Sequence, residues 1–136
     1  MYRWVDHTSE VELEIETTEE REVFDEAARA LAELLGVVAT DTTDTTDATA
    51  ERRVAARATD RPTLLAAWLE ELAFLGETEG FVATRVVELE LGGDGFRATV
   101  AGVVGEPPPL VKAVTYHRLA FERSEAGYFA RVVLDV

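Results

Sequence analysis

The sequence predicts an α+β fold in a single domain, residues 1–136, with two helices packed against a mostly antiparallel sheet. Two segments carry apolar residues at helical spacing, whereas seven shorter segments alternate or are rich in β-branched residues. The strands dominate the second half of the chain and are joined there by short connections, which favours antiparallel pairing. A length of 136 residues is typical of one domain.

The first half begins with two strands and a helix. Residues 2–5 and 11–16 are predicted strands, and in the second one apolar residues alternate with glutamates. The first helix is predicted over residues 18–36, with Thr17 or Thr18 as its N-cap. It ends on a glycine, a residue that commonly stops a helix.

A loop, a strand and a second helix follow. Residues 40–50 are rich in Thr and Asp and lack large apolar side chains, which predicts a flexible acidic loop rather than a metal site. Residues 51–58 resume as a strand. The second helix is predicted to begin at a cap on Thr59 or Asp60 and to close at Gly76.

The remainder of the chain is predicted to be strands only. A Gly-Gly-Asp-Gly turn joins the first two as a hairpin, and three consecutive prolines separate them from the last two. The predicted strands span residues 84–91, 96–104, 110–122 and 127–136.

The charge of the chain is strongly one-sided. It has 27 acidic and 13 basic residues, a formal net charge of −14, and Lys112 is its only lysine. This composition favours a halophilic protein from a salt-rich cytoplasm, because about 1 M salt shortens the Debye length to about 3 Å. A GC-rich genome that prefers Arg to Lys is the alternative. Tight direct binding of nucleic acid is not expected, since that affinity depends mainly on clustered Lys and Arg.

Other features of the composition exclude several classes of protein. Without cysteine there is no disulfide framework and no thiolate metal site. Every apolar stretch is shorter than a membrane span requires, and Asp6 interrupts the N-terminus before a signal peptide could form. We therefore expect a cytoplasmic protein with no membrane partner. Phosphate-binding glycine loops and nucleophile elbows are absent, so no enzyme is predicted.

Three short segments carry the residues with chemical potential. Asp6, His7 and Glu10 lie within five residues, and carboxylates of this kind suit hard cations; a polar turn is the alternative. Lys112 stands in a predicted strand. Either this position requires a compact ammonium group, or a single lysine has been retained there by chance. The chain closes on Asp135-Val136, which places negative charge at a sheet edge or forms an exposed terminus.

Taken together, these segments resemble the archease family. That family carries Asp-His-Thr-Ala-Asp near its N-terminus, a Val-Lys-Ala-(Val/Ile)-Thr-Tyr-His strand, and Asp-Ile or Asp-Val at its end. The corresponding segments here are residues 6–10, 111–117 and 135–136, and the order of the two helices also agrees. The resemblance therefore covers essentially the whole chain, and the lysine strand is its most specific part.

The resemblance implies a non-catalytic protein cofactor of an RtcB-type tRNA-splicing RNA ligase. Such a cofactor promotes guanylylation of the ligase and its multiple turnover. It also implies a divalent metal ion, seen as calcium in the family, held by Glu10, Asp135 and Val136, with Lys112 as the functional lysine. Asp6 and His7 are possible secondary ligands. Ser9-Glu10 departs from the Ala-Asp of the family, and the longer glutamate leaves the metal assignment open.

Two other functions remain open on the sequence. One is a chaperone-like adaptor of another tRNA-processing enzyme, such as a tRNA cytosine-5 methyltransferase, whose basic surface an acidic protein would mask. The other is a metal-dependent hydrolase that uses His7, Glu10 and Asp135.

Overall fold

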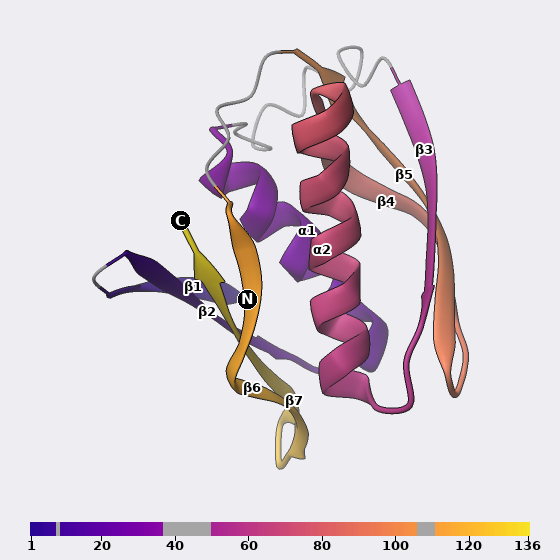
Figure 1. Ribbon diagram of the computed structural model, residues 1–136. Coiled ribbons are helices and arrows are strands. Elements are labelled where there is room, and N and C mark those ends of the chain that lie inside the picture. The colour runs from indigo at the N-terminus through magenta and orange to yellow at the C-terminus, as the bar shows by residue number, and fades with distance from the viewer. Residues whose placement is uncertain (8, 37–49, 106–110) are drawn as a thin grey trace.

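The computed structural model describes residues 1–7, 9–36, 50–105 and 111–136, and for His7 the backbone alone (Figure 1). The loop predicted at 40–50 lies outside these residues except for Ala50. The elements run β1 (Tyr2–His7), β2 (Glu10–Thr17), α1 (Glu20–Leu34), β3 (Ala50–Arg57), α2 (Arg61–Glu79), β4 (Phe81–Leu91), β5 (Gly95–Val104), β6 (Ala113–Ser124) and β7 (Gly127–Asp135).

The predicted α+β fold is confirmed, and its strands divide into two sheets. Every neighbouring pair of strands is antiparallel, in the orders β1-β2-β7-β6 and β3-β5-β4. Figure 1 shows α1 and α2 between the sheets, and each helix contacts strands of both. Among the described residues, no helix is long and apolar enough to cross a membrane.

The first helix begins one residue later than its threonines suggest. Glu19 is the N-cap of α1, and its backbone N–H donates to the Glu22 carboxylate at 2.9 Å. The predicted threonine N-cap is therefore wrong; instead Thr18 donates its hydroxyl hydrogen to the same carboxylate. Gly36 has a φ of 90° just beyond the helix, which confirms it as the predicted stop.

The second helix confirms one predicted boundary and corrects the other. The Asp60 carboxylate accepts a hydrogen bond from the backbone N–H of Thr63 at 2.8 Å, as an N-cap does. The predicted end at Gly76 is wrong, since Gly76 is buried within the helix. Gly80, with a φ of 68°, closes α2 instead, because the left-handed conformation is accessible to glycine without strain.

One hydrophobic core connects all the layers. The buried Trp68 of α2 packs edge-on against Phe24 of α1 and Phe96 of β5, with ring centroids 5.7 and 5.1 Å apart. Its indole N–H donates to the Phe24 carbonyl at 2.9 Å, and Phe24 also contacts Phe121 of β6. These aromatic contacts tie both helices to both sheets.

Candidate functional site

The three predicted segments meet at one end of the four-stranded sheet. Glu10, the first residue of β2, pairs in register with Asp135 at the end of β7, and Asp135 in turn pairs with Ala113 of β6. The backbone N–H of Lys112 donates to the Asp135 carbonyl at 2.8 Å. The central strand β7 therefore brings the N-terminal acidic segment and the lysine segment together.

Glu10 and Asp135 occupy directly opposed positions on one face of the sheet, and both are half-buried. The next residues, Ser9 and Val136, are joined by a backbone hydrogen bond from Val136 N–H to the Ser9 carbonyl at 3.2 Å. Because hydrogen-bonded and non-hydrogen-bonded pairs alternate, Glu10 and Asp135 form a non-hydrogen-bonded pair, the type whose side chains are closest. Two carboxylates on such a pair repel each other unless a cation lies near them.

The turn between β1 and β2 has a strained backbone at Ser9. Its φ is 58°, a left-handed value that is uncommon for a residue other than glycine. The bond between the Ser9 carbonyl and the Val136 N–H holds this turn against the end of β7. Glu10 follows directly, so its position depends on the contact of the turn with the C-terminal strand.

Lys112 directly precedes β6 and has an exposed side chain. Its backbone is anchored by the hydrogen bond to Asp135, and within the described ranges no carboxylate forms an ion pair with its ammonium group. The lysine is therefore held at its base and exposed at its charged end, an arrangement suited to a contact with another molecule.

The two possible secondary ligands, Asp6 and His7, differ in their position relative to Glu10. His7 pairs in register with Glu10, whereas Asp6 pairs with Val11 and therefore lies on the opposite face from Glu10. In the part of the chain that the structure describes, no three His, Cys, Asp or Glu side chains are grouped closely enough to hold a metal ion. The carboxylates of Glu10 and Asp135 supply hard oxygen ligands, so a cation there would need backbone, terminal or water oxygens as well.

The sequence did not predict an ion pair that lies next to this site. Glu12 alternates with core residues along β2, so exposure would be expected, yet it is only 3% exposed. Its carboxylate forms an ion pair with the Arg118 guanidinium at 2.9 Å. Arg118 lies where the pairing of β6 shifts between Thr115 and Ala120, with a φ of 57°, and its carbonyl accepts a hydrogen bond from Arg131 at 2.9 Å. Nothing local in the sequence distinguishes Glu12 from Glu10 and Glu14, which are half-buried.

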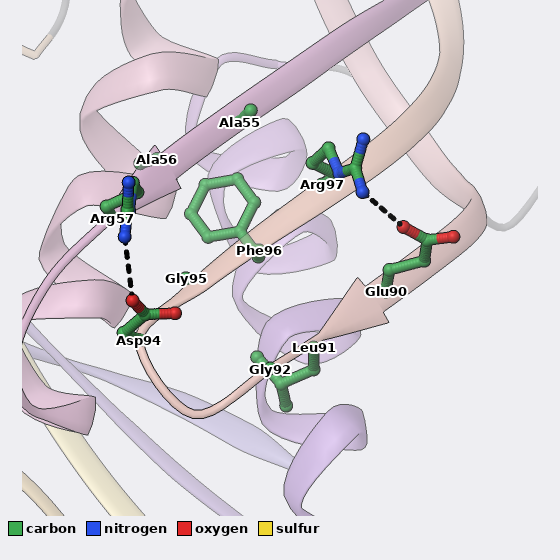
Figure 2. Close-up of a pocket in the computed structure, with 10 residues that line it drawn as sticks. All are labelled: Ala55, Ala56, Arg57, Glu90, Leu91, Gly92, Asp94, Gly95, Phe96 and Arg97. Carbon is green, nitrogen blue, oxygen red and sulfur yellow. Dashed lines mark hydrogen bonds and ion pairs between the residues drawn. The ribbon is translucent and has the colours of Figure 1, made fainter.

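A hollow lies away from these residues, at the hairpin end of the three-stranded sheet. Its volume is about 770 Å³, and none of the predicted site residues lines it. Figure 2 shows its two arginines turned toward carboxylates: Arg57 pairs with Asp94 at 2.9 Å and Arg97 with Glu90 at 3.6 Å. Since these charges already neutralise each other, the hollow is not favoured as a ligand site.

Comparison with known proteins gives the family. Residues 2–136 match the model of the Archease protein family. The chain is 34% identical to protein archease of Archaeoglobus fulgidus, over 99% of this chain and 98% of that protein. The chain belongs to the archease family. Protein archease of Methanosarcina acetivorans is 32% identical, over 99% of this chain and 95% of that protein.

Solved structures agree with the archease fold. A solution structure of Methanobacterium thermoautotrophicum protein 1598 matches with a TM-score of 0.71 and 30% identity, covering 99% of this chain and 98% of the other. A crystal structure of a Thermotoga maritima archease, described there as a possible chaperone, has a TM-score of 0.64 and 21% identity, covering 100% and 98%. At that identity the Thermotoga structure supports the fold alone.

Proposed function

We propose that this archease family member is a non-catalytic cytoplasmic activator of an RtcB-type RNA ligase, which it helps to become guanylylated and to turn over repeatedly. The observation that supports the proposal is the meeting of the lysine segment and the acidic segment at one sheet end. There the Lys112 backbone is bonded to Asp135, which lies opposite Glu10. An exposed ammonium whose backbone is anchored to the acidic strand end is suited to act on a partner's active site, and it needs no nucleophile of its own.

The proposal includes a divalent cation, calcium by family resemblance, at Glu10, Asp135 and Val136. The two carboxylates would supply the charged ligands, and backbone or terminal oxygens of Val136 a neutral or additional one. Such a cation offsets the repulsion between the paired carboxylates. Asp6 contributes least, because the pleat turns it to the other face.

The deciding experiment is multiple-turnover RNA ligation by the cognate ligase at high salt, with and without this protein. Wild type should stimulate turnover, and Lys112→Ala should abolish the stimulation while circular dichroism shows an intact fold. Lys112→Arg should also be impaired, because a planar guanidinium replaces a compact ammonium. The matched control is Arg85→Ala, which removes one exposed positive charge from β4 in the other sheet.

The outcomes separate the candidate functions. Well-folded wild type that leaves ligation unchanged would refute the activator role and favour the adaptor of another tRNA-processing enzyme, which a pull-down at high salt would identify. Equal loss in Lys112→Ala and Arg85→Ala would show that net charge matters and the position of the lysine does not. For the cation, calorimetric titration with calcium should show binding to wild type and none to Asp135→Asn.

A further inference from the structure

Two aromatic side chains of the described residues are exposed, and one of them follows Lys112 on β6. Among the described residues, Phe74 and Tyr116 are the only large aromatic side chains that are mostly exposed, at 58% and 55%. Phe74 lies on α2, and Tyr116 lies on β6, four residues after Lys112. Aromatic rings are enriched among the residues that dominate binding interfaces.

The two rings lie on neighbouring elements. Helix α2 packs against β6, and Figure 1 shows the two elements side by side. The pKa of Tyr116 is raised by burial and then by the negative charges of Glu70 on α2 and of Asp60, the N-cap of α2. Glu70 is one helical turn before Phe74 on the same face of α2. We call Phe74 and Tyr116, with Glu70 beside them, the aromatic patch.

The core does not require Phe74. The opposite face of α2 is buried and fills the space between the sheets, with Leu64, Leu65, Ala66, Trp68, Leu69, Leu72 and Gly76. Phe74 adds nothing to that face, yet an exposed phenyl ring leaves apolar surface in water. Burying it against a partner would remove that apolar surface from water, so Phe74 is suited to be an anchor.

The charge around the aromatic patch indicates the chemistry of the partner. Glu70, Glu71 and Glu77 flank Phe74 along α2, and no Lys or Arg occurs in the sequence between Arg61 and Arg85. A complementary surface has an apolar recess surrounded by basic residues. An enzyme that binds RNA phosphates displays clustered Lys and Arg, so its surface can provide the basic residues around such a recess.

We propose that the aromatic patch is the docking surface for the RNA ligase, with Phe74 and Tyr116 entering an apolar recess in a basic region of the enzyme. This inference rests on the proposed function. Docking through the aromatic patch would place Lys112 at the interface, because β6 carries Tyr116 and begins directly after the lysine. Phe74 and Tyr116 then provide affinity, whereas Lys112 provides activation.

The test separates affinity from activation. Binding to the ligase is measured by calorimetry or biolayer interferometry, and ligation is measured over a range of concentrations of this protein. Phe74→Ala and Tyr116→Ala should each raise the Kd at least tenfold and shift half-maximal stimulation equally, with full stimulation at saturation. Tyr116→Phe, which keeps the ring, should bind almost as wild type does. Lys112→Ala should bind normally and fail to stimulate at any concentration.

The control is Val87→Ala, which removes an exposed apolar side chain from β4 and should change neither quantity. If wild type stimulates the ligase but Phe74→Ala and Tyr116→Ala bind and act at unchanged concentrations, the docking surface lies elsewhere while the activator role stands. If folded wild type neither binds nor stimulates the ligase, the proposed function fails, and the docking inference fails with it.

Discussion

The ion pair between Glu12 and Arg118 should stabilise the irregular part of β6, and Arg118→Ala tests this. The variant leaves the Glu12 carboxylate, 4% exposed at its side chain, without its guanidinium partner. Breaking a fully buried pair costs about 3–5 kcal/mol. Because 49% of the Arg118 side chain is exposed, water screens the pair, and we expect about 1–2 kcal/mol.

A double-mutant cycle isolates the pair from other effects of the substitution. Glu12→Gln removes the charge at the other end, and the double variant should lose about 1 kcal/mol less than the sum of the single losses. Arg118→Gly is the backbone control, because its φ of 57° costs an L-residue about 1–2 kcal/mol that glycine avoids. Arg118→Gly should therefore be no less stable than Arg118→Ala.

The assay is urea unfolding at 25 °C, followed by circular dichroism at constant salt. The same variants enter the ligation assay, in which Arg118→Ala should reduce stimulation less than Lys112→Ala does, since it loosens the strand without removing the ammonium. Additive losses in the cycle, within about 0.3 kcal/mol, would show that the two side chains do not stabilise each other. The structural reasoning on β6 would then be refuted.

Three further perturbations have expected outcomes. Gly102→Ala should cost about 3 kcal/mol in urea unfolding, because an added Cβ would collide with the backbone of Val82, whereas Gly93→Ala, with open space, should stay within about 0.5 kcal/mol. Burial, aided by Glu33, raises the pKa of Tyr2 from 10.0 to about 12; absorbance titration should show this late step, absent in Tyr2→Phe. The stabilisation from the neutral phenol is present below about pH 10 and lost as the pH rises through about 12. Finally, the net charge of −14 should make the unfolding midpoint rise between 0.1 and 2 M salt, and an unchanged midpoint would contradict the halophilic interpretation.

Local features of the sequence were the most predictable. Asp60 is one of the two residues predicted as the N-cap of α2, because the hydrogen bond that defines a cap reaches only three residues ahead. The prediction that α2 ends at Gly76 was wrong for the same local reason, since a glycine at the end of an apolar run resembles a helix C-cap. The true C-cap, Gly80, is four residues later. The division of seven strands into two sheets depends on pairing between distant segments, and no short window of sequence contains it.

The site was partly predictable. Glu10, Lys112 and Asp135 were selected by residue type and resemblance, and the register of the strands places them at one sheet end. Their roles as ligands or activators stay predictions. The burial of Glu12 was not predictable, because its partner Arg118 lies on a strand at the far end of the chain and inside an irregular turn of that strand.

The strand order β1-β2-β7-β6 has a consequence for local opening of the sheet. Asp135 lies on the strand between β2 and β6, and the segments of Glu10 and Lys112 do not pair with each other. Every backbone link between those two segments therefore passes through β7. Fraying of β7 at Asp135 would separate the lysine segment from Glu10 in one step, even with both helices in place.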